Sequence, residues 1–80
     1  MSTSEEMVAR SPAALGRAIR AARHGQGLTQ SELAERARTN RFSIAQAENG
    51  GATKAVEKLF ETLAALELEL VVRPRQGWKV

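Results

Sequence analysis

Four polar side chains between residues 40 and 46 have the chemistry needed to bind the edges of nucleic-acid bases. They are Asn40, Arg41, Ser43 and Gln46, and the aromatic Phe42 lies among them. Arginine pairs with guanine, asparagine and glutamine pair with adenine, serine bonds to either, and an apolar ring can touch the thymine methyl group. Because all five fall within about two helical turns, we expect one short helix to present them to DNA.

Two short helices joined by a tight turn would position these side chains. Thr29 and Glu32 have the spacing of a capping box, which predicts the start of the first helix. Asn40 is a suitable N-cap for the second helix, and the sequence Asn-Gly-Gly at 49–51 ends it after residue 48. This arrangement is typical of a helix-turn-helix, whose second helix lies in the DNA major groove.

Apolar residues at helical spacing predict two further helices and the core. Ser11 and Pro12 start a helix that runs to about residue 24, and another amphipathic pattern follows Thr53. The side chains expected to face inward are Leu15, Ala18, Ile19, Ala22, Leu28, Leu33, Ala34, Ala37, Ile44, Ala47, Val56, Leu59, Phe60, Leu63 and Ala64. The sequence therefore predicts an all-α, four-helix domain over residues 11–66, after a disordered N-terminal segment at residues 1–10.

The central stretch resembles the Xre-type, lambda-repressor-like helix-turn-helix family. The matching residues are Leu28-Thr29-Gln30, Glu32-Leu33-Ala34, Ile44 and Glu48-Asn49-Gly50. Arg38 replaces the turn glycine of the family, and Thr39 replaces its usual valine or isoleucine. A non-glycine residue in a left-handed turn costs about 1 kcal/mol, so we expect a slightly altered turn and less burial at Thr39.

This resemblance also assigns roles to residues outside the second helix. It implies that Gln30 contacts a DNA phosphate and that Arg23 forms a structural ion pair with Glu48. Arg38, in the turn, is a weaker candidate for a phosphate contact because of its charge. Arg17 and Arg20 precede Arg23 at a spacing of three residues, and Arg17 and Arg20 would serve equally well as an ordinary solvated face.

A strand is predicted near the C-terminus, where the hydrophobic period changes to two. Residues 66–73 alternate between apolar and mostly charged side chains, and Pro74 ends the pattern. Leu68, Leu70 and Val72 would share one face. As the only strand expected, it needs a partner, and the simplest partner is the same strand of a second copy. The alternative is that the preceding helix continues through Glu67, because leucine and glutamate favour helices.

Residues 11–74 as a whole resemble the HipB antitoxins, the partners of HipA-type Ser/Thr kinase toxins. The features are the Ser-Pro helix start, the Xre-type core and the Leu-Glu-Leu-Glu-Leu ending before Arg73 and Pro74. The resemblance implies a homodimer that exchanges strands at residues 67–74, binds a palindromic operator to repress its own operon, and holds a HipA-like kinase inactive. The competing interpretations are a free-standing Xre-type repressor without a toxin and a module that binds only protein.

The C-terminal tail, residues 75–80, contains the only tryptophan, Trp78. Tryptophan is frequent at the centres of protein interfaces, so Trp78 is a candidate contact for the toxin. It would equally well pack on its own domain.

Composition restricts the remaining possibilities. The 80 residues carry a net charge of +3, and seven arginines against two glutamates lie between residues 10 and 46, around the proposed DNA-binding helix. With one histidine, no cysteine and no glycine-rich phosphate loop, the sequence predicts no enzyme activity, no metal and no cofactor. The absence of an apolar N-terminal run predicts a cytoplasmic protein with no membrane association.

Overall fold

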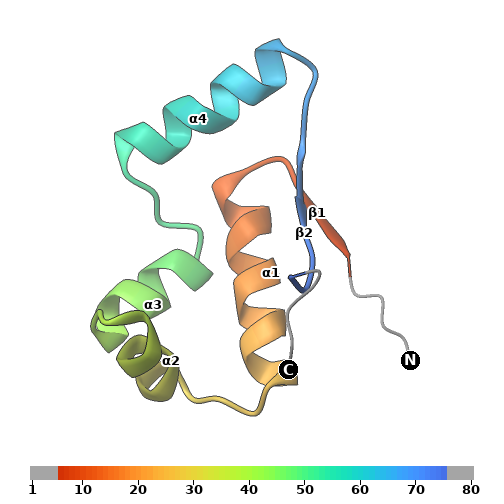
Figure 1. Ribbon diagram of the computed structural model, residues 1–80. Coiled ribbons are helices and arrows are strands. Elements are labelled where there is room, and N and C mark those ends of the chain that lie inside the picture. The colour runs from red at the N-terminus through yellow and green to blue at the C-terminus, as the bar shows by residue number, and fades with distance from the viewer. Residues whose placement is uncertain (1–5, 76–80) are drawn as a thin grey trace.

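The computed structural model describes residues 6–75 as four α-helices and two short β-strands (Figure 1). In chain order the elements are β1 (Met7–Ala9), α1 (Pro12–Gly25), α2 (Gln30–Ala37), α3 (Arg41–Glu48), α4 (Lys54–Ala65) and β2 (Leu70–Val72). The prediction of a four-helix domain is confirmed. The helices are accompanied by one small antiparallel sheet, which packs beside α1 (Figure 1).

The predicted side-chain caps begin the helices. The Ser11 hydroxyl accepts the backbone N–H of Ala14 at 3.1 Å, in front of α1. At α2 the capping box is complete, because Thr29 Oγ1 accepts the N–H of Glu32 at 3.0 Å and Glu32 Oε1 accepts the N–H of Thr29 at 2.8 Å. The hydrogen bond from the Thr29 backbone lowers the pKa of Glu32. These local bonds satisfy backbone donors that a helix leaves unpaired at its start.

The sheet differs from the expectation at both ends of the chain. Met7–Ala9, inside the segment expected to be disordered, forms β1 and pairs antiparallel with β2 in the register Met7↔Val72, Val8↔Val71 and Ala9↔Leu70. The expectations of disorder at these residues and of a single strand in the chain are therefore wrong. β1 supplies the backbone partner that β2 needs, and Ala9 is fully buried. Residues 1–5 lie outside the described part of the chain.

β2 is also shorter than the predicted strand. Leu66 caps α4, and Glu67 takes a left-handed conformation with φ 59°. This turn allows the backbone N–H of Leu68 to bond the carbonyl of Leu63 at 2.8 Å, so the helix is closed before the strand begins. The strand is therefore confirmed only from Leu70 to Val72, and the alternative of a helix that continues through Glu67 is wrong, because α4 ends at Ala65.

The core of the described region is small. Its buried apolar side chains are Ala9, Ala18, Ala34, Ile44 and Phe60. Ala22, Ala37, Leu59 and Ala64, which were expected to face inward, are exposed. Figure 1 shows the reason for the two α4 residues, because α4 stands apart from α2 and α3 and meets only one end of α1. Among residues 6–75, no helix is both long and apolar enough to cross a membrane.

Candidate nucleic-acid interface

The C-terminal end of α3 lies almost directly against α1. The contact is possible because Gly16 of α1 has no side chain: a Cβ atom there would lie 2.7 Å from the backbone oxygen of Glu48. Such an approach is closer than real Cβ atoms allow, so any larger residue would force the two helices apart. Gly16 thus fixes the position of α3 on the domain.

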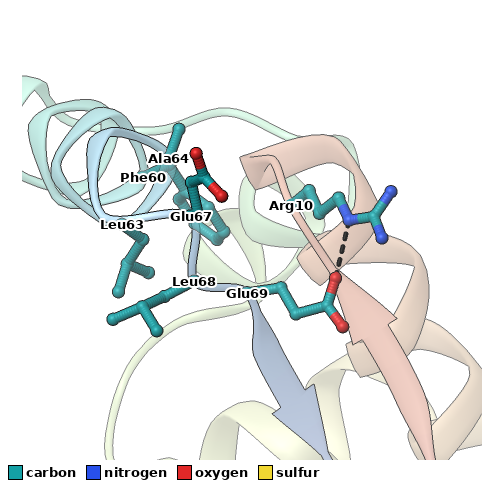
Figure 2. Close-up of a pocket in the computed structure, with 7 residues that line it drawn as sticks. All are labelled: Arg10, Phe60, Leu63, Ala64, Glu67, Leu68 and Glu69. Atoms are coloured by element: carbon teal, nitrogen blue, oxygen red, sulfur yellow. Dashed lines mark hydrogen bonds and ion pairs between the residues drawn. The ribbon is translucent and has the colours of Figure 1, made fainter.

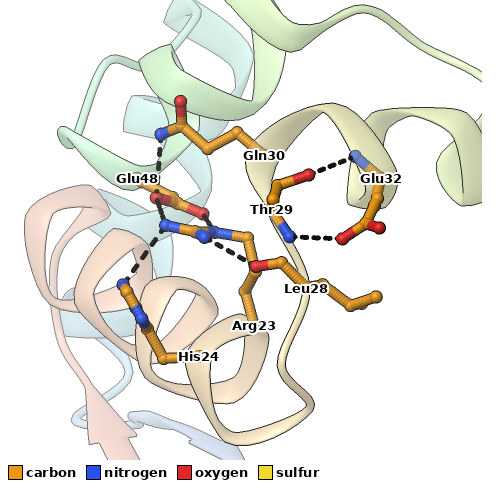
Figure 3. A network of polar contacts seen from close by, with 7 residues as sticks. All are labelled: Arg23, His24, Leu28, Thr29, Gln30, Glu32 and Glu48. Atoms are coloured by element: carbon orange, nitrogen blue, oxygen red, sulfur yellow. Dashed lines mark hydrogen bonds and ion pairs between the residues drawn. The ribbon is translucent and has the colours of Figure 1, made fainter.

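A buried ion pair ties the same end of α3 to α1 (Figure 3). Arg23 donates from Nε to Glu48 Oε2 at 2.6 Å and from Nη2 to Glu48 Oε1 at 3.0 Å. Its third bond, from Nη1, goes to the backbone oxygen of Leu28 at 2.8 Å. The Arg23 and Glu48 side chains are only 9% and 2% exposed. The structure therefore brings together the two residues that the family resemblance paired, in the two-pronged geometry that arginine forms with carboxylates.

The ion pair also stabilises the charged forms of both side chains. The hydrogen bond from Arg23 lowers the pKa of Glu48, and the hydrogen bond to Glu48 raises the pKa of Arg23. Gln30 Nε2 donates a further bond to Glu48 Oε1 at 3.2 Å (Figure 3). One carboxylate thus connects α1, the start of α2 and the end of α3, and holds the helix-turn-helix as a unit.

The predicted base-contacting residues of α3 do not all point in the same direction. Side chains advance by about 100° per residue along a helix, so Phe42 and Gln46 point in nearly the same direction. Both are exposed, Phe42 at 69%. Arg41 and Ser43 lie on opposite flanks of this direction. Arg41 borders a hollow against α2, whereas the half-buried Ser43 borders a different hollow beside residues 51–53.

Asn49 belongs to the same exposed face and was not among the predicted site residues. It follows Phe42 by seven residues and Gln46 by three, and its side chain is exposed. The helical spacing i, i+4, i+7 in the sequence would have identified it. Asn49 was assigned only to the end of the helix, where it does serve as C-cap.

Two of the predicted DNA contacts already have partners within the chain. Asn40 Oδ1 accepts the backbone N–H of Ser43 at 2.8 Å and caps α3. Reading adenine with both ends of an amide requires that oxygen, so the capping bond fixes the direction of the Asn40 amide and leaves one lone pair of the oxygen and the two N–H groups for DNA. Gln30 likewise donates one amide N–H to Glu48, and its amide has a second N–H group.

The turn between α2 and α3 keeps its shape despite the arginine. Arg38 has φ 59° and ψ 45°, which are standard left-handed values, so the arginine takes the conformation that favours glycine. The backbone N–H of Thr39 bonds the Ala34 carbonyl at 2.9 Å, which closes α2. Thr39 is exposed, as expected. The Arg38 side chain is exposed next to the start of α3.

The predicted dimerisation residues occupy different positions. Leu70 and Val72 are half-buried, and Val72 lines a groove with Met7 and Ala18, so this face of β2 packs toward α1 of its own chain. Leu68 precedes the strand and is 54% exposed. Trp78 lies outside the described residues.

The comparisons with known proteins support the interpretation of this geometry. A helix-turn-helix family model matches residues 19–72, which include α2, α3 and the turn between them. A search of curated proteins and a search of solved structures each found no match. The match covers more than half of the chain, so the chain belongs to the Xre/lambda-repressor-like helix-turn-helix family of DNA-binding transcription regulators.

Proposed function

We propose that the protein is a homodimeric repressor that binds a palindromic operator with α3 in the major groove. The observation that carries the DNA-binding mode is the exposed face of α3, where Phe42, Gln46 and Asn49 lie together on a helix anchored by a buried ion pair. A short rigid helix with an amide and an apolar ring on its outer face fits a groove that presents hydrogen-bonding edges and thymine methyl groups.

Exposed arginines surround the start of α3. Arg36 lies in the last turn of α2, Arg38 in the turn, and Arg41 at the first residue of α3, and all three are exposed. A guanidinium can hold a phosphate with two parallel hydrogen bonds or a guanine with the same fork. Arg41 borders the hollow between α2 and α3 and is therefore the arginine best placed to enter the groove, while Arg38 is better placed for the backbone.

Two substitutions separate base contacts from phosphate contacts. The DNA is the palindrome that the unaltered protein selects from a randomised pool, with a scrambled duplex as its control. Arg41→Ala should weaken palindrome binding by about 1–3 kcal/mol and relax the preference at one base pair per half-site. Arg38→Ala should weaken both DNAs alike and reduce the slope of log K against log salt concentration by about one.

Titrations at several salt concentrations measure both effects. An equal loss on both DNAs for Arg41→Ala would reassign Arg41 to the DNA backbone. If substitutions at Asn40, Arg41, Ser43 and Gln46 all left palindrome binding unchanged, α3 would not be the recognition helix.

The proposal of a homodimer rests on apolar side chains that one chain leaves uncovered. They are Val8, Leu59, Leu66, Leu68 and Val71, each at least 50% exposed. Figure 2 shows Leu63 and Leu68 side by side where α4 meets the strand, pointing away from the ion pair between Arg10 and Glu69. Exposed leucines gathered on one side of a domain mark a protein interface.

The backbone of β2 supports the same proposal. In a two-stranded sheet each strand has one edge without a partner strand in the described chain, so β2 can still add a second β2 around a twofold axis. To bind adjacent half-sites of a palindrome, such a dimer has to hold its two α3 helices about 34–36 Å apart, one helical turn of DNA.

The finer proposal is that this repressor is an antitoxin. The sequence of residues 66–74 and its resemblance to HipB antitoxins support repression of its own operon and inhibition of a HipA-like Ser/Thr kinase, with Trp78 as one contact. Co-purification with the product of the adjacent gene, using the full chain and a chain lacking residues 75–80, tests both parts. A neighbouring gene that encodes no kinase would favour a free-standing repressor, and unchanged affinity without the tail would exclude Trp78 as a contact.

A further inference from the structure

Three glycines, Gly16, Gly50 and Gly51, lie around the C-terminal end of α3, and a side chain on each would strike a different neighbour. A Cβ atom on Gly16 would strike the backbone oxygen of Glu48 at 2.7 Å. Gly50 has φ +83°, and a Cβ there would lie 2.9 Å from the Cα of Ala13. Both glycines are therefore required by the backbone itself, and larger residues at either position would disturb the fold.

Gly51 has a different neighbour. A Cβ atom on Gly51 would lie 2.7 Å from Cγ of the Gln46 side chain and 3.0 Å from the Gln46 backbone oxygen. Gly51 does not have a positive φ, so alanine is compatible with its backbone conformation. The Gly51 N–H donates to the Gln46 backbone oxygen at 2.8 Å, and this bond holds residue 51 close to the end of α3.

The main consequence falls on the Gln46 side chain, because its Cγ is the closer atom at 2.7 Å and rotation about χ1 moves it, whereas the backbone oxygen at 3.0 Å needs to shift by only a few tenths of an ångström. In a helix the χ1 angle of most residues has two common values, since the third clashes with the preceding turn. A methyl group at position 51 would exclude the observed position of Gln46 Cγ and favour the other value. The hollow of about 180 Å³ that Gln46 shares with Ser43 and Gly51 would change at the same time.

We infer that Gly51 is a positioning residue for DNA recognition: its missing side chain sets the direction in which Gln46 projects from α3. This inference rests on the proposed function, because it takes Gln46 as a base contact. An amide displaced from its base edge loses the paired hydrogen bonds that distinguish one base pair from another. Gly51 therefore affects sequence preference without touching DNA.

The test compares Gly51→Ala, Gln46→Ala and the double variant, all as full-length protein, on the selected palindrome and on scrambled DNA. Gly51→Ala should weaken palindrome binding by about fivefold or more, with its loss of preference at the same base pair as Gln46→Ala. Binding to scrambled DNA should not change. In the Gln46→Ala background the second substitution should have no further effect, because Cγ is already absent.

Gly25→Ala is the matched control, since a Cβ atom at Gly25 would meet nothing within 4 Å. Couplings that report χ1 of Gln46 in the free protein should change in Gly51→Ala and stay unchanged in Gly25→Ala. Additive losses in the double variant, or equal losses on both DNAs, would overturn the inference. So would a Gly51→Ala protein that stays unfolded when Gln46 is also alanine, because the glycine would then serve the backbone.

Failure of the proposed function has a separate signature. If Gln46→Ala itself leaves palindrome binding unchanged, Gln46 is not a base contact and the inference falls with it. If Gln46→Ala weakens binding but Gly51→Ala does not, the role of α3 stands and only the role of Gly51 is refuted.

Discussion

The two halves of the domain are held together in different ways. The first half, α1 to α3, is joined by polar bonds and a close helix contact: Gly16 admits the backbone of α3, and Arg23 and Glu48 fasten its end. The second half, α4 with the sheet, contributes only two buried apolar side chains, Ala9 and Phe60. Its ion pairs, such as Arg10–Glu69, lie on the surface.

This difference indicates which half is complete within one chain. The half that carries the proposed DNA contacts has its buried polar groups satisfied internally, so its geometry does not depend on a partner. The other half leaves Leu59, Leu66 and Leu68 at least 50% exposed, which is the condition expected of a surface completed by another molecule. Substitutions should therefore act on folding in the first half and on association in the second.

The largest expected effect is loss of the buried ion pair. Glu48→Ala leaves the Arg23 guanidinium buried without its carboxylate, and breaking such a pair lowers the free energy of unfolding by about 3 kcal/mol or more. Urea denaturation measures the change. Glu61→Ala is the control, because Glu61 and Lys58 are 71% and 79% exposed and 3.8 Å apart, and exposed pairs contribute little. Equal stability for Glu48→Ala and the unaltered protein would show that the ion pair between Arg23 and Glu48 does not hold the first half together.

Substitution of the exposed leucines should act on association instead. Leu59 and Leu68 are each about half exposed, so burying the remainder in a dimer contributes about 1 kcal/mol apiece. Leu59→Lys combined with Leu68→Lys should weaken dimerisation by about 2 kcal/mol, roughly thirtyfold. Sedimentation over a concentration series measures this.

Ala65→Lys controls for one added lysine on α4, because Ala65 is exposed one turn after Glu61. It should leave the dimer intact. A stable monomer of the unaltered protein would refute the proposed dimer. The second half of the domain would then, like the first, need no second copy of the chain.

Acid should weaken the first half selectively. The pKa of Glu48 is lowered from its ordinary value of 4.5, chiefly by the hydrogen bond from Arg23. The stability this provides is fully present above pH 4.5 and is lost as the pH falls through the lowered value. Glu32 contributes in the same direction through its bond from Thr29.

Unfolding measured between pH 7 and pH 3 tests this dependence. The acid-induced loss should be smaller in Glu48→Gln, and Glu32→Gln separates the contribution of the capping box because glutamine can make the same bond. An unchanged pH profile in both variants would show that other carboxylates control acid stability.

The sequence predicted the first half well because its signals are local. Thr29 with Glu32, and Asn40 before α3, lie within three residues of the backbone groups they cap. The pairing of Arg23 with Glu48 is not local, and only the resemblance to the helix-turn-helix family suggested it.

The second half depends on contacts that no local pattern encodes. β1 has three residues, too few to show alternation, and its partner lies more than 60 residues away. The helical stripe of α4 predicted burial of both Leu59 and Phe60, but only Phe60 reaches the core. A hydrophobic period identifies an apolar face and does not identify what covers it. The role proposed for Gly51 could not be predicted from the sequence either, because it depends on where the Gln46 side chain lies in the folded protein.

The smallest expected effect lies in the turn between α2 and α3. Arg38 has a left-handed backbone, φ 59°, which disfavours an arginine by about 1 kcal/mol relative to glycine. Arg38→Gly relieves this strain but adds freedom to the unfolded chain, which offsets about 0.4–1 kcal/mol, so the net gain in unfolding free energy should be at most about 0.5 kcal/mol. Arg38→Ala removes the same charge and keeps the strain, and it should therefore give no gain.

The two variants at position 38 separate stability from DNA binding. Both lack the guanidinium, so both should bind palindrome and scrambled DNA more weakly and with a shallower salt dependence. Only the glycine variant should melt at a higher temperature. A glycine variant that gains stability while keeping full DNA affinity would show that the arginine has no phosphate contact. If the glycine and alanine variants were equally stable, the strain at position 38 would be no larger than the entropy that glycine adds to the unfolded chain.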